Sequence, residues 1–270
     1  MKSHIFQIYY SEESRKMIDS SFIPLDNSLN ERADWREYWP IRNFLIENNL
    51  EKNTFYGFLS PKFNQKTKLN GAEIIEHHRN IAHRYKMINL SPYYDLSSFY
   101  QNTFEQASAS HKDIAEKSIR CMSKIFPDLR ISDLVMTVEN TIFCNYFTAQ
   151  RDFWIEWFYI CEKIFKWAED SSSELFEDLN AITNHGNELI PFKVFLIERI
   201  ASILAITREE KIDKYNSQTP IYGATIFKYE EDHLSLMKLD SYKNSYQKTG
   251  DSIYLTLFSE LRQEIISKNQ

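Results

Sequence analysis

Glu198 is the residue of this chain whose position most clearly suggests chemistry. It lies in residues 192–206, which are apolar nearly all round and predict a helix buried on most sides. An ionised carboxylate in such a helix is costly unless it is paired or hydrogen-bonded. Two interpretations follow: a structural pair with a nearby arginine or with Ser202, or a carboxylate that binds sugar hydroxyls or accepts a proton.

Short polar loops follow two predicted strands, at residues 55–59 and 87–90. The first loop, Ser60-Pro61-Lys62, offers a hydroxyl and a cation that could neutralise a diphosphate leaving group. The second leads to Asp95, a carboxylate that could bind a metal ion or a nucleotide ribose. The alternatives are a solvated surface lysine and a turn-forming aspartate. Open α/β sheets keep their ligands at the carboxyl ends of strands, so both loops are candidate sites.

Familiar motifs for metal binding and nucleophilic catalysis are missing. The sequence has no Asp-x-Asp, so we expect a metal-independent mechanism, with Mg²⁺ or Mn²⁺ left open as an alternative. The histidines within residues 77–83 lack the i, i+4 spacing of a helical zinc pair. There is no Gly-x-Ser-x-Gly, and the three cysteines lie in apolar contexts, which is typical of small buried side chains in a reducing compartment.

Composition narrows the class of protein. With 270 residues, 43% of them hydrophobic, the chain can bury a large core. Its 5 glycines lie far apart, so neither G-x-G-x-x-G nor a Walker loop can form. A formal charge of -6 argues against nucleic acid as a partner. No run of apolar residues is long enough to span a membrane and no signal segment is visible, so the expected location is cytoplasmic.

The hydrophobic patterns predict an α/β fold with a mainly helical C-terminal part. Strands are expected at residues 4–10, 55–59, 87–90 and 134–143, and helices at residues 11–18, 35–45, 98–126, 154–168, 192–206 and 251–266. Residues 24–30 read as a connection, and residues 169–187 as a loop or short helix. Residues 215–250 are polar and give no clear pattern. A single domain over residues 1–270 is the simplest organisation.

Several segments, taken in order, match one family. They are Tyr56-Gly57-Phe58-Leu59, Phe104-Glu105-Gln106 followed by His111 and Asp113, Asn145-Tyr146-Phe147, and residues 195–200 around Glu198-Arg199. Together they resemble bacterial glycosyltransferases that build cell-surface polysaccharides, in particular the galactofuranosyltransferase domains of O-antigen polymerases. Ala107 replaces an aromatic residue of that pattern, and Ser60-Pro61-Lys62 stands where those enzymes often have Tyr-Arg-Arg.

The resemblance implies a GT-A-like nucleotide-sugar domain with a mostly parallel central sheet flanked by helices. Residues 1–150 would bind the nucleotide-sugar donor, and the mainly helical residues 151–270 would face the acceptor, a glycan or lipid-linked glycan. The implied catalytic candidates are Glu198, Asp95 and His111. The implied substrate-binding residues are Tyr9, Ser60, Lys62, Glu105, Asn145 and Arg199. A lipid-linked acceptor would bring the protein to the inner face of the plasma membrane.

Two other classes of protein stay open. A non-catalytic carbohydrate-binding or assembly module could keep a transferase-like fold and lose the metal motif. Nucleotide binding separates it from a transferase, because a scaffold does not need a nucleotide. A helical interaction protein without a ligand fits the acidic composition but not the two polar loops after the strands.

Overall fold

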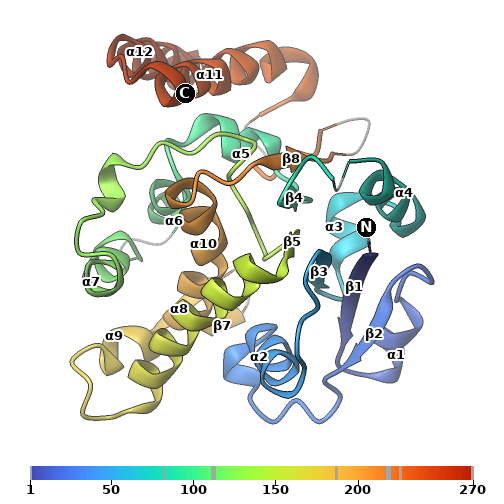
Figure 1. The fold of residues 1–270 in the computed structure, drawn as a ribbon. Coiled ribbons are helices and arrows are strands. Elements are labelled where there is room, and N and C mark those ends of the chain that lie inside the picture. The colour runs from blue at the N-terminus through green and yellow to red at the C-terminus, as the bar shows by residue number, and fades with distance from the viewer. Residues whose placement is uncertain are drawn as a thin grey trace.

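The molecule is organised around a six-stranded sheet (Figure 1). The computed structural model describes residues 2–81, 83–110, 114–185, 188–216, 220–224 and 227–268. The strand order is β2-β1-β3-β5-β4-β8. The strands are β1 (Lys2–Tyr9), β2 (Ile23–Asp26), β3 (Thr54–Leu59), β4 (Met87–Asn89), β5 (Phe147–Gln150) and β8 (Ile212–Lys214).

β5 is the strand of this sheet that runs against the others. It pairs antiparallel with both β3 and β4, whereas β1 is parallel to β2 and β3, and β4 is parallel to β8. The start of β5 therefore lies at the same edge as the carboxyl ends of the other strands. Gly57 allows close packing here, because a Cβ atom at this position would lie 2.6 Å from Cγ2 of Thr148.

Helices cover both faces of the sheet. Alternate side chains of β1 show the division, since Ile5 packs into one buried cluster and Phe6 into another. The Ile5 cluster includes residues of α3 (Phe63–Thr67) and α4 (Gly71–Ile81). The Phe6 cluster includes residues of α2 (Tyr38–Glu47), α8 (Arg151–Glu169) and α10 (Phe192–Thr207). This mixed, mostly parallel sheet between helices is compatible with a Rossmann-like fold.

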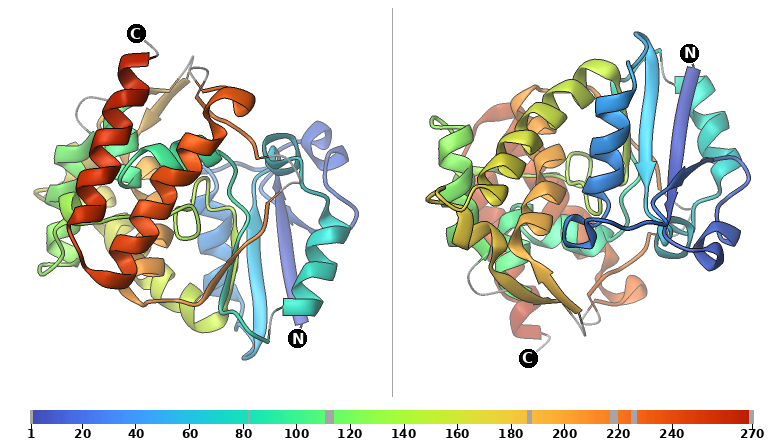
Figure 2. Two further views of the ribbon diagram at one scale, coloured as in Figure 1. Left: turned by 90° about the horizontal axis from the view of Figure 1, so that it is seen from above. Right: turned by 90° about the horizontal axis from the view of Figure 1, so that it is seen from below.

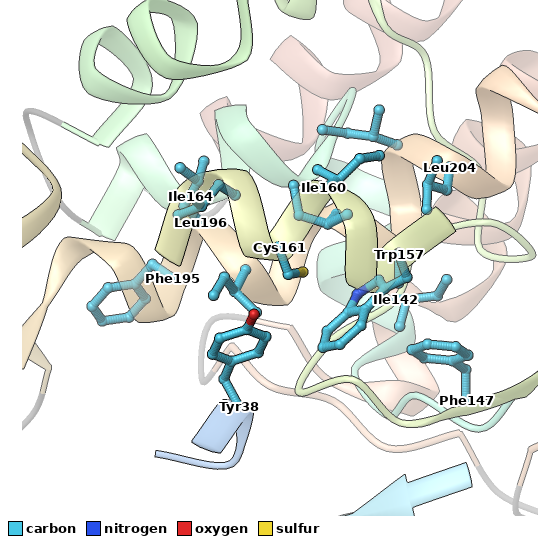
Figure 3. Packing of buried hydrophobic residues seen from close by; sticks show 14 of the residues in the cluster. Tyr38, Ile142, Phe147, Trp157, Ile160, Cys161, Ile164, Phe195, Leu196 and Leu204 are labelled. Carbon is cyan, nitrogen blue, oxygen red and sulfur yellow. The ribbon is translucent and has the colours of Figure 1, made fainter. Parts of the chain in front are cut away.

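The packing of α8 against α10 fixes the helix that contains Glu198. Figure 3 shows that α8 contributes Trp157, Ile160, Cys161 and Ile164 to this core, and that α10 contributes Phe195, Leu196 and Leu204. Trp157 and Leu204 are fully buried. Close packing of this kind leaves a helix little freedom to shift, so α10 is a rigid support for its polar side chains.

The C-terminal helices form an outer layer. α11 (Tyr229–Thr249) and α12 (Ile253–Lys268) lie side by side against α5 (Tyr94–Phe99), at the far end of the molecule from β2 (Figures 1 and 2). The remaining elements are α1 (Glu12–Lys16), η1 (Ala33–Trp35), α6 (Thr103–Ser110), α7 (Ile114–Ile125), η2 (Ile131–Asp133), α9 (Phe176–Asn180) and the hairpin β6 (Ile182–His185) with β7 (Glu188–Pro191). Across the described ranges, no helix is both long and apolar enough to cross a bilayer.

Most of the strands and helices predicted for the apolar core are confirmed, and the predictions for residues 98–126 and 134–143 differ from the structure. The strands predicted at 4–10, 55–59 and 87–90 correspond to β1, β3 and β4, and the helices at 154–168, 192–206 and 251–266 correspond to α8, α10 and α12. The strand predicted at 134–143 is absent, because those buried residues follow irregular backbone. Within the helix predicted at 98–126, the structure describes α6 and α7, and residues 100–102 are not helical. α11 occupies much of the unassigned tail.

Candidate functional site

Glu198 projects from α10 toward the loop that leads into β5. Ser202, one helical turn further on, binds this loop: its hydroxyl accepts from the backbone N–H of Ile142 at 2.8 Å and donates to the Ile142 carbonyl at 3.3 Å. Residues four apart share one face of a helix. Glu198 is therefore held beside Cys144 and Asn145, where β5 begins at the carboxyl edge of the parallel strands.

The Glu198 carboxylate is partly buried and has no hydrogen-bonding partner among the residues that the structure describes. Burial raises its pKa to about 7, with Glu37 raising it further and with Arg199 and Lys66 opposing this shift. The two structural partners expected from the sequence are engaged elsewhere. Arg199 donates to the carbonyls of Thr103 and Phe195, and Ser202 binds Ile142.

Lys66, on the short helix after β3, is a second positive charge that acts on this carboxylate, after that of Arg199. Its Nζ donates to Sγ of Cys144 at 3.6 Å and lies 6.0 Å from the ring centroid of Tyr146. Burial lowers the pKa of Lys66, but Cys144, Tyr93 and Glu198 together raise it above its usual value. The ammonium group is therefore charged at neutral pH, in partly buried surroundings where it acts strongly on other charges.

Ser60 joins this cluster through Tyr146. The Ser60 hydroxyl lies 2.5 Å from the Tyr146 hydroxyl, and the backbone carbonyl of Ser60 accepts from the side-chain amide of Gln7 at 3.3 Å. Burial raises the pKa of the Tyr146 phenol, so it stays protonated and acts as a hydrogen-bonding group. The end of β3 and the start of β5 are thus connected directly, as the antiparallel pairing of these strands requires.

A small cavity of about 10 Å³ lies beside Glu198. Its lining includes residues of η1, of the loop before β5 and of α10: Trp35, Arg36, Glu37, Tyr38, Cys144, Asn145, Val194, Ile197 and Glu198. Oδ1 of Asn145 is buried and has no partner within the described part of the chain. Because a buried acceptor without a partner costs free energy, Asn145 is available to bind a ligand.

Three residues that line this cavity have positive φ values: Arg36, Cys144 and Asn145, with 49°, 57° and 54°. Residues other than glycine pay roughly 1–2 kcal/mol for this conformation, less for asparagine. Such residues persist where the surrounding structure determines them, and they cluster at functional sites. The strain adds a second, independent reason to place a site here.

Asp95, the second predicted catalytic carboxylate, has a different environment. It is fully buried, and its oxygens accept from the backbone N–H groups of Gly223 at 2.8 Å and Ala224 at 2.7 Å. Burial raises its pKa, and these amides oppose the shift. Both carboxylate oxygens are used to hold residues 223–224 against α5, so the structure supplies a positioning role for Asp95.

The other predicted site residues are dispersed. Glu105 pairs with Arg262 of α12 at 2.6 Å, Lys62 is exposed at the start of α3, and Arg199 is turned toward backbone carbonyls. Tyr9 lies at the end of β1, where its hydrogen bond with Asp26 raises its pKa. His111 lies outside the described residues. Of the predicted set, the structure brings Glu198 and Asn145 to one cavity, and it connects Ser60 to Tyr146, the residue after Asn145.

Sequence reasoning missed Lys66, Glu37, Tyr93 and Cys144 at this site. Glu37 and Lys66 belong to polar segments and resemble ordinary surface residues in the sequence. One signal was available: Lys66 follows Lys62 by one helical turn, so a cation predicted after β3 could come from either position. Cys144 was assigned to apolar packing, and burial does raise the pKa of its thiol to about 12.

The described side chains do not form a metal site. They include no group of three or more histidine, cysteine, aspartate or glutamate side chains placed to hold an ion, and both oxygens of Asp95 are taken by backbone amides. We therefore derive no step through a metal ion. No protein family model, curated protein or solved structure matches this chain.

Proposed function

We propose that this protein is a glycosyltransferase, which moves a sugar from a nucleotide-sugar donor to a hydroxyl group of a growing cell-surface glycan. The observation that carries the proposal is the Glu198 carboxylate, which has no hydrogen-bonding partner in the described structure, a pKa of about 7 and a cation nearby. A general base works best when its pKa lies near the working pH. Glu198 meets this requirement at the edge of the sheet where α/β proteins bind ligands.

Each group of the cluster has a role in this reaction. The acceptor oxygen forms a bond to the anomeric carbon, and the bond from that carbon to the donor phosphate breaks, with its electron pair going to the nucleotide diphosphate. Glu198 accepts the proton of the acceptor hydroxyl. Lys66 neutralises charge that develops on the diphosphate, which is the role a divalent ion would otherwise fill. A single displacement of this kind inverts the anomeric carbon.

The fold supports a GT-A-like assignment within the broader α/β class. The donor side would be formed mainly by residues 1–150, which include Ser60, Lys66 and Asn145, and the acceptor side would include Glu198 from residues 151–270. The resemblance of residues 145–147 and 195–200 to polysaccharide glycosyltransferases points to the same two segments. We propose a cytoplasmic enzyme that meets its glycan or lipid-linked glycan acceptor at the inner face of the plasma membrane.

The experiment is a ligand screen by thermal denaturation, followed by a transfer assay. A nucleotide that binds the native state raises the midpoint of unfolding, so the purified protein is screened with uridine, guanosine, cytidine and thymidine diphosphates and their sugars, with and without chelator. We expect one nucleotide class to stabilise the protein in the presence of chelator. Glu198→Gln should bind it and fail to transfer, whereas the control Glu47→Gln, an exposed residue at the end of α2, should behave like wild type.

A non-catalytic carbohydrate-binding module is the second candidate. The cavity beside Glu198 holds only about 10 Å³, so a donor sugar enters only if η1 or the loop at Cys144 moves. A module that binds glycans needs no such movement. If no nucleotide stabilises the protein, the transferase proposal fails and this candidate takes its place.

A further inference from the structure

A larger, polar groove lies on the α4 side of the same sheet edge. It encloses about 790 Å³ between α4 and the segment after β8. Its described lining consists of Lys68, Leu69, Glu73, Glu76, His77, Asn80, Tyr215, Asn216, Pro220 and Ile221. This volume is within the usual range for sites that bind small molecules.

One wall of the groove is a fixed pair of rings. The centroids of His77 and Tyr215 are 4.2 Å apart, and Nε2 of His77 lies 2.6 Å from a carboxylate oxygen of Asp213. The backbone N–H of Tyr215 donates to the carbonyl of Asn89, which attaches this segment to β4. The rings are therefore held before any ligand arrives, and preorganisation reduces the entropy cost of binding.

The polar groups of the groove are mainly hydrogen-bond acceptors on one face of α4. Glu73, Glu76 and Asn80 have the i, i+3, i+7 spacing of a single helical face, and all three are exposed. Carboxylates accept hydrogen bonds only, and an amide both donates and accepts. With two carboxylates and one lysine in its lining, the groove disfavours an anionic diphosphate. An aromatic ring beside hydrogen-bond acceptors suits a neutral ligand with many hydroxyl groups.

The groove continues toward the Glu198 cluster. A narrow second cavity shares Leu69, Tyr215, Asn216, Pro220 and Ile221 with the groove and extends to Ser91 and Tyr93. Electrostatic interactions link the Tyr93 phenol to Cys144, Lys66 and Glu198. The groove is therefore a neighbour of the proposed reaction centre, with a cavity of only about 10 Å³ between them.

We propose that this groove is an acceptor subsite that binds neutral sugar units of the glycan chain, behind the unit that receives the new sugar. This proposal rests on the proposed function, because the groove is an acceptor subsite only if the protein is a glycosyltransferase. Glycan binding by the groove can be tested separately. Glu73 and Glu76 accept hydrogen bonds from sugar hydroxyls, and the His77–Tyr215 wall packs against the apolar face of a sugar ring.

The test uses the full chain on an array of short neutral bacterial oligosaccharides. Tyr215→Leu and the double variant Glu73→Gln with Glu76→Gln should each weaken array binding at least tenfold. Arg79→Gln, an exposed α4 residue absent from the described groove lining, is the matched control and should leave binding unchanged. Far-ultraviolet circular dichroism and unfolding midpoints show whether each variant is folded. Tyr215→Phe, which keeps the ring, should retain most of the binding.

Two results would overturn the subsite: no oligosaccharide on the array binds the wild-type chain, or the folded groove variants bind as strongly as wild type. Nucleotide stabilisation, measured in parallel, separates this outcome from failure of the proposed function. If the protein binds a nucleotide but no oligosaccharide on the array, the groove is not a glycan subsite and the transferase proposal stands. If oligosaccharide binding depends on Tyr215 and no nucleotide binds, the groove is a glycan-binding site of a non-catalytic protein.

Discussion

Glu198, which is partly buried, and Asp95, which is fully buried, are two acids near one edge of the sheet, and their surroundings are opposite. Asp95 accepts from two backbone amides, at 2.8 and 2.7 Å, whereas no hydrogen bond reaches the Glu198 carboxylate within the described ranges. Two lysines differ in the same way, one against the carbonyls at the end of α5 and one that acts on Glu198. Lys243 donates to the carbonyls of Ser97 and Tyr100, and Lys66 has a weak thiol contact at 3.6 Å.

The comparison distinguishes polar groups that hold parts of the fold together from polar groups that are available for a reaction. The groups around Asp95 and Lys243 are satisfied, and they hold residues 223–224 and α11 against α5. The groups around Glu198 and Lys66 retain bonding capacity inside the protein, which costs stability and provides chemistry. The pKa values of both acids are raised, so a raised pKa alone does not identify a catalytic carboxylate.

Loss of the base should give the largest difference between the two regions. We expect Glu198→Gln to reduce transfer at least hundredfold, because glutamine cannot accept the proton and general bases contribute roughly 10²–10⁴-fold. Asp95→Asn, where folded, should keep transfer within about threefold. Initial rates of nucleotide release, measured with the donor identified by screening, check both values. Equal losses of transfer activity in the two variants would contradict the different roles given to Glu198 and Asp95.

The pH dependence of stability should come next in size. Since the pKa of Glu198 is about 7 in the folded state and near 4.5 in the unfolded state, the folded state binds more protons between these values. Stability of the wild type should therefore fall as pH rises from 4.5 to 7, by at most about 3 kcal/mol relative to Glu198→Gln. Urea unfolding of both proteins at pH 4.5, 6 and 8 measures this difference. A constant difference would contradict the raised pKa.

Asp95→Asn should destabilise the protein by about 1–3 kcal/mol. An amide nitrogen at either position would face a backbone N–H donor, so Gly223 or Ala224 would lose its partner in a buried environment. Urea unfolding at neutral pH gives the loss, with Asp128→Asn on the exposed surface as the control. If Asp95→Asn destabilises the protein no more than Asp128→Asn does, the hydrogen bonds from Gly223 and Ala224 to Asp95 do not contribute to stability.

Lys66→Met should weaken nucleotide binding about tenfold, or roughly 1.4 kcal/mol, because it removes the buried cation proposed to face the diphosphate. Lys62→Met is a stringent control, since Lys62 lies one helical turn earlier on the exposed surface. Titration calorimetry with the stabilising nucleotide gives both affinities. A larger effect at Lys62 would move the phosphate contact away from the Glu198 cluster.

The smallest effect concerns the backbone before β5. Asn145→Gly relieves a left-handed conformation and should raise stability by less than about 1 kcal/mol, while removing the buried amide should weaken ligand binding. Glu209→Gly, at φ 50° after α10, should raise stability without affecting binding. Urea unfolding and nucleotide titration separate the two variants. Equal binding in both would exclude Asn145 from the site.

The apolar pattern predicted the elements of the core and failed where burial is irregular. β1, β3 and α10 were found because each is a mainly apolar run, and α8 because its apolar residues follow a helical period. Residues 134–143 were predicted to be a strand because they form a strand-like run in the sequence. Leu134, Val135 and Met136 are buried, but they pack without pairing in a sheet. β5 was missed because its four residues lead directly into α8.

The site was predictable only in part. Glu198 was found because a charge within an apolar helix is conspicuous in the sequence. Glu37 and Lys66 could not be found in that way, because their importance comes from tertiary contacts between η1, α3 and α10. Asp95 was singled out for its place after a strand, and the sequence contains no signal for the amides of residues 223–224 that satisfy it.

The most direct test of the central claim is the titration of Glu198 itself. Carbon-13 NMR of protein labelled at the glutamate carboxyl carbons follows each side chain with pH, and the resonance that disappears in Glu198→Gln is assigned to Glu198. We predict a midpoint near pH 7 in the absence of ligand. A midpoint near 4.5 would mean that the carboxylate is solvated or paired, and Glu198 could not be the base of this proposal.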